Sequence, residues 1–257
     1  MTYMPRVKLE SFEDTNKENW LRFVSDEAGT RLSKSLLVVA KRVIEIPDIC
    51  CVITLKDELV SLENFARRWT NKFLDGYENR PSKRISNPIG TLHDTILDEI
   101  ITARINITSS ELQSIKYGHR LSMSAENIAG TLLEEYLANK LLNYQWHCCW
   151  GETMRSIDFC NENGDLIQIK NSDNSENSSS KAVRDGTVIK HWFRRFSRTG
   201  KTNWEALNQL VNIKKIDDLF TENSFKDFVK NAVLNNPGSV FIERDSPYWN
   251  NQRNNDN

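Results

Sequence analysis

The stretch at residues 157–171 constrains the fold most, because it predicts two short strands joined by a tight turn. Residues 161–165 supply the turn, since Asn and Gly accept positive φ angles. The residues that follow alternate, which places Gln168 and Lys170 on one face of a strand. Paired as a hairpin, the strands would set both side chains beside Asp158. A carboxylate, an amide and an ammonium group on one face suit metal-assisted cleavage of a phosphodiester.

The composition is that of a globular chain, with 39% hydrophobic and 27% charged residues and a mean hydropathy of −0.56. A length of 257 residues suits one large domain or two small ones. The net charge of −1 gives no overall basic excess, so any surface for a polyanion has to be local. The five cysteines include no CxxC spacing, which argues against a disulfide framework or structural zinc. Because no signal core and no run of about 20 apolar residues occurs, we expect a cytoplasmic protein without a membrane segment.

Residues 1–121 are predicted to form a helical region that serves as scaffold, dimerisation surface or DNA clasp. Apolar residues recur there at spacings of three and four, which is the helical period. The segments with this pattern are Ser33–Ile46, Leu59–Tyr77 and Thr91–Ile105. Pro47 ends the first of them. Ser109 or Ser110 is expected to cap a further short helix, with Glu111 near its N-terminus.

The next helix, predicted over Ala125–Leu142 with Ser124 as its cap, would bring a carboxylate to the site. Glu134 and Glu135 both lie in its middle, and adjacent helical residues point in different directions. One of them is therefore expected to face the sheet, and the other to meet solvent or a salt bridge. The periodicity favours Glu134, which lies one turn after Gly130 on the side expected to face the sheet.

A polar segment follows the hairpin at residues 171–180 and cannot be core. It is either a surface loop or a loop whose hydroxyl and amide groups meet phosphates and base edges. The candidate DNA-binding residues in it are Asn171, Ser172, Asp173, Asn174, Ser175, Asn177, Ser178, Ser179 and Ser180.

The segment after it, residues 181–201, is strongly basic and holds a single acid, Asp185. Its aromatic residues are spaced to form the buried stripe of a helix beginning near Val188, with the cations around it. A solvated basic face is the ordinary interpretation of such a run, but its place after the candidate site favours neutralisation of DNA phosphates. The candidate DNA-binding cations are Lys181, Arg184, Lys190, Arg194, Arg195, Arg198 and Lys201.

The remaining pattern predicts supporting elements. They are a strand at Tyr144–Trp150, a helix at Trp204–Val211 capped by Asn203, a helix at Phe225–Leu234 opened by Ser224 and Asp227, and a strand at Ser239–Glu243. We therefore expect a catalytic core at residues 122–248, with its DNA-contact segment at residues 171–204, and a disordered tail at residues 249–257.

The hairpin residues match the needs of phosphodiester hydrolysis, which are a divalent cation, a polarised water and positive charge near the phosphate. Asp158 would supply a hard oxygen ligand for Mg²⁺, and Lys170 would lie near the water and the phosphate. The Gln168 amide is a weaker ligand than a carboxylate, so the Ile169 carbonyl and a helix glutamate are expected to help. Taken singly, an Asp near a strand start is usually a turn residue and a Lys at a strand end a solvated charge. The combined pattern favours catalysis.

A glutamate-bearing helix, a strand, Asp158, a hairpin and a QxK run at residues 168–170 follow one another in this chain. That order resembles the PD-(D/E)xK nuclease fold, an α/β fold in which helices flank a mixed central sheet, here with a helical N-terminal region. More narrowly, residues 124–210 resemble type II restriction endonucleases of the SinI family. The runs that carry this likeness are Ile167–Ser180, Gly186-Thr187, Trp192-Phe193 and Ser197–Trp204.

The resemblance implies a homodimer that cuts double-stranded DNA at a short palindrome of the GGWCC type. It also implies a need for Mg²⁺ and a cognate DNA methyltransferase in the same cell. In such an enzyme Asp158 would bind the metal with Gln168 or the Ile169 carbonyl, Lys170 would orient the water, and a helix glutamate would anchor Lys170 or a water. The chain departs from the strict motif at Gln168, which leaves the number of metal ions open, and at Ile157, where a proline often stands.

Other classes of protein fit the same pattern. One is a repair or phage-defence nuclease of the same fold, which would nick a plasmid at random instead of giving a defined fragment ladder. Another is a non-catalytic DNA- or RNA-binding protein whose contact surface is residues 181–201 and whose Asp158 and Lys170 are structural. A metal centre at His147 and Cys148 is not expected, because adjacent strand residues face opposite ways and one cluster supplies too few ligands.

Overall fold

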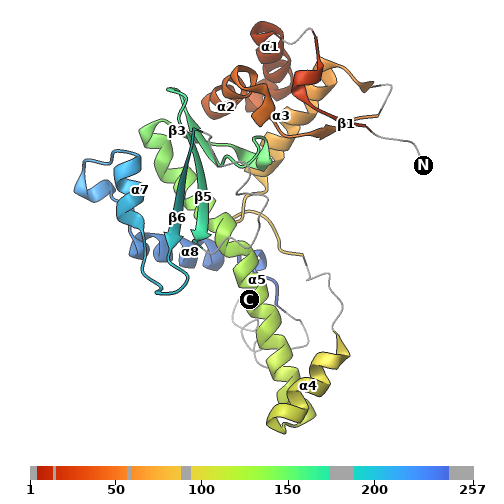
Figure 1. Ribbon diagram of the computed structural model, residues 1–257, viewed down its shortest axis with the longest axis vertical. Helices are drawn as coiled ribbons and strands as arrows, with labels where there is room; N and C mark the ends of the chain where they lie inside the picture. The colour runs from red at the N-terminus through yellow and green to blue at the C-terminus, as the bar shows by residue number, and fades with distance from the viewer. Residues whose placement is uncertain (1–4, 14–15, 57–58, 88–93, 174–187, 243–257) are drawn as a thin grey trace. The chain divides into compact units, whose positions relative to one another are not determined.

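The computed structural model describes residues 5–13, 16–56, 59–87, 94–173 and 188–242 (Figure 1). The chain divides into two compact units. The first consists of Met1–Arg80 and Leu133–Phe228, and the second of Pro81–Leu132 and Val229–Asn257. Helices α5 (Ser109–Leu141) and α8 (Glu222–Asn235) contribute residues to both units.

Helices α1 (Lys17–Ala28), α2 (Lys34–Glu45) and α3 (Leu62–Glu78) pack together in the first unit. A short antiparallel pair, β1 (Arg6–Val7) with β2 (Ile53–Thr54), accompanies them. The side chains of Ser33 and Ser61 accept backbone N–H groups at the starts of α2 and α3. The apolar faces meet around Trp20 and Trp69, whose ring centroids are 5.2 Å apart. The helices predicted at these two positions from apolar spacing are therefore confirmed.

Within the described residues, one sheet has four strands in the order β3-β4-β5-β6. They are β3 (Trp146–Cys148), β4 (Phe159–Asn161), β5 (Leu166–Ser172) and β6 (Ile189–Arg195). β4 pairs antiparallel with β3 and with β5, while β5 and β6 pair parallel, so the sheet is mixed. The hairpin predicted at residues 157–171 is confirmed as β4 and β5, and the predicted α/β class is confirmed with it.

Within the described part of the basic segment, Ile189–Arg195 form strand β6, so the helix predicted to begin near Val188 is wrong. Trp192 and Phe193 suit a helical stripe, but aromatic residues are also good strand formers. Parallel pairing with β5 decides between the two, because it buries Trp192 beside Ile169 and satisfies the backbone of both strands. Phe196, expected in the buried stripe, is 38% exposed.

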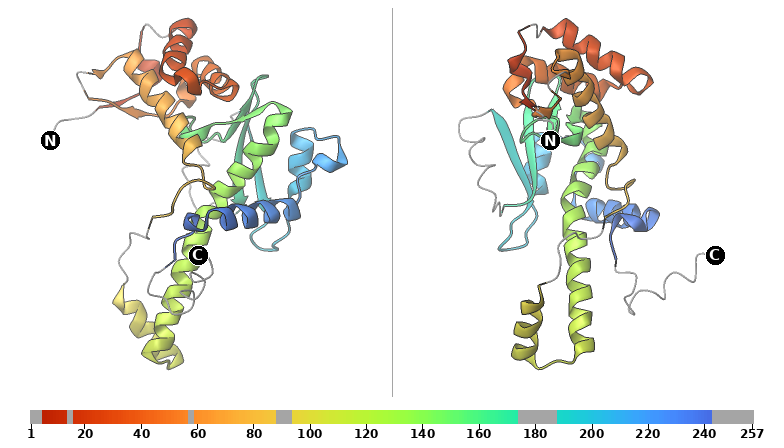
Figure 2. Two further views of the ribbon diagram at one scale, coloured as in Figure 1. Left: turned by 180° about the vertical axis from the view of Figure 1, so that it is seen from behind. Right: turned by 90° about the vertical axis from the view of Figure 1, so that its right-hand side faces the viewer.

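Different helices pack against the two faces of the sheet. One face joins the hydrophobic core of the N-terminal helices through Leu166 and Ile189. On the other face, Trp192 packs on Trp204 of α7 (Trp204–Leu210) with ring centroids 5.1 Å apart, and Trp204 packs on Tyr136 of α5. Helices α5 and α7 therefore lie along one face of the sheet, and the N-terminal helices pack at the end of the sheet that carries Leu166 and Ile189 (Figure 2).

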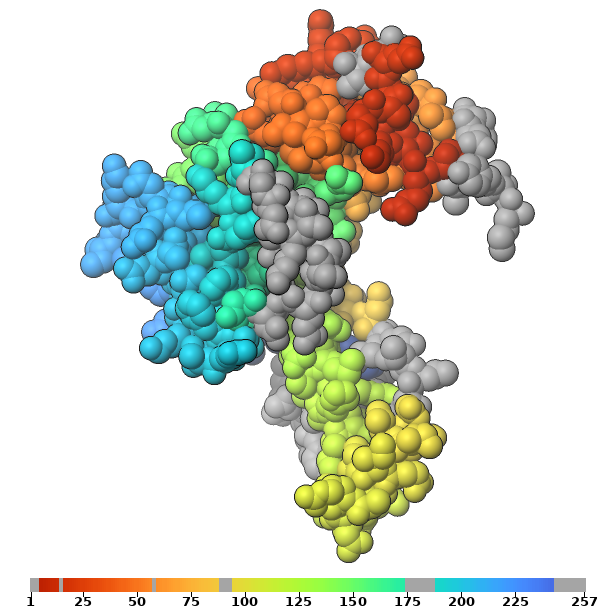
Figure 3. Space-filling view, in the orientation of Figure 1, coloured from red at the N-terminus to blue at the C-terminus, as the bar shows by residue number. Residues whose placement is uncertain are grey.

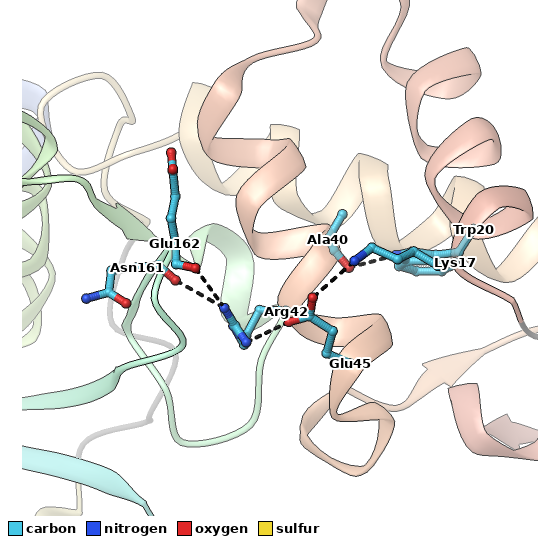
Figure 4. Close-up of polar contacts among 7 residues, drawn as sticks. All are labelled: Lys17, Trp20, Ala40, Arg42, Glu45, Asn161 and Glu162. Atoms are coloured by element: carbon cyan, nitrogen blue, oxygen red, sulfur yellow. Dashed lines mark hydrogen bonds and ion pairs between the residues drawn. The ribbon is translucent and has the colours of Figure 1, made fainter.

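A polar junction also fixes helix α2 to the turn between β4 and β5 (Figure 4). Arg42 of α2 donates from Nη2 to the carbonyl oxygens of Asn161 and Glu162, both at 3.4 Å. Its Nη1 lies 2.6 Å from the Glu45 carboxylate, which also accepts from Lys17 at 3.2 Å. The turn that orients the hairpin is thus held by the N-terminal helices.

Helix α5 is longer than predicted and runs without a break through the expected start at Ser124. That start is wrong, because Ser124 lies inside the helix and its Oγ accepts the backbone N–H of Phe241 at 2.8 Å. The helix begins instead at a capping box in which Thr108 and Glu111 exchange hydrogen bonds, one residue before the expected cap. Among the described helices, α5 included, none is long and apolar enough to cross a membrane.

The C-terminal elements differ from prediction at their ends. α7 confirms the helix predicted after Asn203. Earlier in the chain, α4 (Thr95–Ile105) confirms the described part of the helix predicted at Thr91–Ile105. α8 begins at Glu222, earlier than the predicted Phe225, because Thr221 and Ser224 exchange cap hydrogen bonds.

The strand predicted at residues 239–243 is wrong over its described part. A 3-10 turn at Pro237–Ser239 replaces its beginning. The carbonyl of Gly238 accepts the N–H of Ser86, and Phe241 donates to α5, so these backbone groups are satisfied without a sheet partner. The tail predicted at residues 249–257 lies outside the described residues.

Candidate active site

The hairpin places Gln168 and Lys170 of β5 on one face of the sheet, which we name the site face, because the two residues are two positions apart on a strand. Asp158 lies just before β4 and beside β5, since its N–H donates to the Ile167 carbonyl at 2.9 Å and its carboxylate accepts the Ile169 N–H. The ammonium of Lys170 acts on this carboxylate. The structure therefore brings the three residues into one neighbourhood.

The Asp158 carboxylate is half-buried and tied to strand β5. Its Oδ2 accepts the backbone N–H of Ile169 at 2.7 Å. Burial raises the pKa of this carboxyl from 3.8 to about 6; the hydrogen bond from Ile169 and the ammonium of Lys170 lower it, and the carboxylate of Glu152 raises it. A carboxylate in these surroundings is stabilised when a cation binds beside it.

The Gln168 side chain supplies a buried oxygen acceptor. Only 8% of the residue is exposed, and its Oε1 accepts no hydrogen bond from any residue in the described part of the chain. A buried acceptor in this state is unfavourable by about 1–3 kcal/mol unless a water or cation meets it. The Asp158 carboxylate is bonded to Ile169, the next residue of the strand, so this carboxylate, the Gln168 amide oxygen and the Ile169 carbonyl are candidate ligands for a hard divalent cation.

A cation at this position would depend on few protein carboxylates. Across the described ranges, no three His, Cys, Asp or Glu side chains gather closely enough to hold a metal ion. Mg²⁺ commonly binds through one or two carboxylates and keeps several waters, so the donor set of Asp158, Gln168 and the Ile169 carbonyl fits it.

The two helix glutamates have different surroundings. Glu135 is 2% exposed and forms an ion pair with Arg80, whose Nε lies 3.1 Å from its Oε1. Glu134 is half-buried, and its charge acts on the thiol of Cys148 in β3. Burial first, then the carboxylates of Glu134 and Asp158, raise the pKa of that thiol. Glu134 therefore lies toward the sheet, and Glu135 is the member of the pair that is held in a salt bridge.

Some candidate DNA-binding cations are engaged within the fold. Lys190 Nζ lies 2.7 Å from the Asp165 carboxylate. Arg194 is more deeply enclosed, with its side chain 13% exposed, and it pairs with Glu222 at 2.6 Å and donates to Asn171 Oδ1 at 2.8 Å. Both cations point away from the site face, because they alternate along β6 with the residues that share it.

The turn after β6 carries cations that remain exposed, and it lies at the surface of the first unit (cyan in Figure 3). Arg195, Arg198 and Lys201 form no salt bridge with any residue that the structure describes. Asp173 holds this turn, since its Oδ1 accepts the N–H of Ser197 at 2.7 Å. That hydrogen bond, and more weakly the charge of Arg198, lower the pKa of Asp173.

The first two residues of the polar segment at 171–180 point to opposite faces of the sheet. Ser172 ends β5 in register with Arg195, on the site face, and Asn171 points to the opposite face. The other candidates lie outside the described residues, namely Asn174, Ser175, Asn177, Ser178, Ser179, Ser180, Lys181 and Arg184.

Sequence reasoning missed His191, which is exposed and pairs in register with Gln168. Assigning this segment to a strand would have found it, because alternation then separates His191 from the buried Trp192. It also missed Glu152, whose carboxylate acts on Asp158. Glu152 has a φ of 53° and follows Gly151, whose φ is 69°. No spacing pattern in the sequence reveals such a turn.

The fold is α/β with a mixed sheet, and a carboxylate, a buried amide oxygen and an ammonium group lie near one another on it. This arrangement is consistent with the class of restriction endonucleases. The family model described as SinI restriction endonuclease matches residues 22–235. The chain is 34% identical over 226 residues to the type II restriction enzyme Eco47I of Escherichia coli, covering 85% of this chain and 95% of that protein. It is also 34% identical over 225 residues to the type II restriction enzyme SinI of Salmonella infantis, covering 85% and 94%.

This chain belongs to the SinI restriction endonuclease family. It is a type II site-specific deoxyribonuclease, as the resemblance in residues 124–210 implied, and the likeness extends over most of the chain.

Proposed function

We propose that the enzyme cuts double-stranded DNA at a short palindrome by Mg²⁺-dependent hydrolysis, in a core of the PD-(D/E)xK type. The observation that carries the proposal is the buried Gln168 Oε1, which lacks a donor in the described part of the chain and belongs to the residue before Ile169, whose N–H holds the Asp158 carboxylate. These two oxygens and the Ile169 carbonyl would hold Mg²⁺. When bound, the ion would polarise the scissile phosphate and the attacking water.

The chain's own residues have separate tasks in this proposal. Asp158 would bind the metal ion in a fixed orientation, because its Oδ2 is already held by the Ile169 N–H. Lys170 keeps a positive charge where the phosphate gains negative charge, and it orients the attacking water. The Glu135 ion pair with Arg80 supports the fold, whereas Glu134 lies on α5, which packs on the face of the sheet opposite the site face.

DNA would lie along the site face and the turn after β6. Arg195, Arg198 and Lys201 are exposed there, and neutralising phosphates with such cations supplies most of the sequence-independent affinity for DNA. The polar loop between β5 and β6 follows the site directly, so its amide and hydroxyl side chains are suited to base edges.

The biological setting follows from the relatives, both named type II restriction enzymes. We infer a homodimer, a site of the GGWCC type and a cognate DNA methyltransferase in the same cell. A cytoplasmic location agrees with the five cysteines, all of which are free thiols. The helical region at residues 1–121 would act partly as scaffold for the core at residues 122–248, because its helices share a hydrophobic cluster with the sheet.

Digestion of a sequenced plasmid by the purified protein, with and without Mg²⁺, tests the proposed activity. We expect a discrete fragment ladder only with Mg²⁺, and sequencing of the fragment ends then gives the palindrome and the cut position. Random nicking would instead indicate a repair or phage-defence nuclease, and binding without any cleavage would indicate a non-catalytic DNA-binding protein.

Lys170→Ala tests the assignment of the site. This variant is expected to bind the mapped duplex with near wild-type affinity and to lose cleavage by a factor of at least about 10², because the charge beside the phosphate is gone. Binding is measured by a mobility shift with Ca²⁺ in place of Mg²⁺, and cleavage under single-turnover conditions. A wild-type rate for this variant would show that the site lies elsewhere.

A further inference from the structure

Strand β6 divides its side chains between the two faces of the sheet, and one of these is the site face. In a parallel pair, residues in register point to the same face. β6 is in register with β5 from Leu166 opposite Ile189 to Ser172 opposite Arg195. The β6 residues on the site face are therefore Ile189, His191, Phe193 and Arg195.

His191 lies beside Gln168 on the site face. The two residues are in register on β6 and β5. Neighbouring strands are about 4.8 Å apart, so the imidazole lies one strand from the amide. On the other side of β5, the Asp158 carboxylate accepts the N–H of the next residue, Ile169. His191 is exposed, whereas Gln168 is buried, so solvent can reach the side chain that lies next to the enclosed amide.

The residues on either side of His191 fix its direction. Lys190 bonds to Asp165 at 2.7 Å on the opposite face. The Trp192 Nε1 donates to the Asn203 carbonyl at 2.8 Å, again on that face. With both neighbours held, a one-residue slip of β6 would expose Trp192 and break these bonds, so His191 keeps its place on the site face.

We infer that His191 binds the scissile phosphate, with an imidazole N–H donating to a non-bridging oxygen. This inference rests on the proposed function, since it takes the phosphate to lie at Asp158 and Gln168. An imidazole is a suitable donor, because a hydrogen bond to an anionic phosphate oxygen is stronger than one between neutral groups. It strengthens further as negative charge grows on those oxygens in the transition state, which makes His191 a catalytic residue.

Single-turnover cleavage of the mapped duplex by His191→Ala and His191→Gln tests this role. We expect His191→Ala to be slower by roughly 10- to 100-fold, as for loss of a hydrogen bond to a charged group. Its affinity for the duplex in Ca²⁺ should change by less than about threefold, since many other contacts hold the DNA. His191→Gln, which keeps an N–H donor, should recover part of the rate. Val188→Ala, an exposed change just before β6, is the matched control and should cut at the wild-type rate.

Sulfur substitution at the cleaved phosphate separates direct contact from a structural effect. Duplexes with the Rp or the Sp phosphorothioate at that position replace one non-bridging oxygen at a time. If His191 donates to one of these oxygens, the corresponding diastereomer slows the wild type but slows His191→Ala little further, because the two changes remove the same contact. If the effects of sulfur substitution and of His191→Ala multiplied for both diastereomers, the inference would be overturned. A wild-type rate for His191→Ala would also overturn it.

The parallel results for Lys170→Ala distinguish the two levels of the proposal. If Lys170→Ala is inactive and His191→Ala is normal, the site is correct and the role of His191 is wrong. If both variants cut at the wild-type rate, the site itself is wrong.

Discussion

At the scale of single residues, the fold buries the Asp158 carboxylate in a position where a bound cation would stabilise its charge. Burial raises the pKa of this carboxyl to about 6, even though the Ile169 N–H and the Lys170 ammonium favour its ionised form. The folded protein therefore holds the proton more tightly than the unfolded chain does. It follows that the contribution of Asp158 to stability is fully present below pH 3.8 and is lost as the pH rises through about 6.

Asp158→Asn should consequently be inactive and, without metal, more stable than the wild type at neutral pH. The amide can still accept the Ile169 N–H, but the unfavourable buried charge is gone. We expect a gain of up to about 2 kcal/mol at pH 7.5, shrinking toward zero near pH 4. Urea unfolding in EDTA at the two pH values measures it. A gain of equal size at both pH values would contradict the argument, because it could not come from this titration.

The alternation of a five-residue run was enough to predict that Gln168 and Lys170 share one face, since a strand has a fixed period of two. Contacts between residues far apart along the chain could not be predicted. The periodicity favoured Glu134, but nothing near Glu135 in the sequence indicates that Arg80 supplies its salt bridge. His191 was missed for a different reason, because its direction depends on whether its segment is a strand.

At the scale of elements, β6 combines two functions in one run of cations. A helix would have placed the basic residues around a buried stripe, whereas the strand sends alternate residues to opposite faces. Arg194 is enclosed by Glu222, Asn171 and the ring of Phe225, which lies 5.4 Å from its guanidinium carbon. Composition could predict a basic surface here, but only the pairing with β5 separates structural cations from exposed ones.

Arg194→Ala and Arg198→Ala should therefore fail in different ways. Loss of Arg194 leaves the Glu222 carboxylate without its cation in a partly buried position, so we expect the free energy of unfolding to fall by roughly 2–3 kcal/mol. Loss of the exposed Arg198 should change it by less than about 0.5 kcal/mol. The same change should weaken DNA binding and reduce the salt dependence of affinity by about one ion. Urea unfolding measures the stability of the two variants, and mobility shifts at several salt concentrations measure their DNA binding. If Arg198→Ala lost stability and Arg194→Ala lost DNA binding, Arg194 would be the DNA contact.

At the scale of the molecule, the helices α1 to α3 and the sheet form one body within the first unit. Their shared hydrophobic cluster includes Trp20 and Trp69 on the helices and Cys160 and Leu166 on the strands. The amphipathic patterns of α2 and α3 predicted these helices, because their period is local. That these helices pack against the hairpin was not predictable, since the contacts join residues about a hundred positions apart.

The Arg42 junction should couple this N-terminal cover to catalysis. Its guanidinium is only 16% exposed and binds two carbonyls of the turn that orients the hairpin of Asp158 and Gln168 (Figure 4). Arg42→Ala removes the guanidinium donor from the Glu162 carbonyl and from the Asn161 carbonyl, which keeps the Gly164 N–H, so we expect a loss of about 1–2 kcal/mol in the free energy of unfolding. The cleavage rate should also fall at temperatures where the variant is folded, because the strands bearing the site lose an anchor.

Lys34→Ala is the matched control, since Lys34 also reaches from α2 to this turn. Its salt bridge to Glu162 at 2.6 Å joins side chains that are 67% and 43% exposed. An ion pair so open to water contributes at most about 1 kcal/mol. Urea unfolding and single-turnover cleavage of both variants give the comparison. If the two variants lost equal stability and activity, the carbonyl contacts of Arg42 would not be what connects the N-terminal helices to the site.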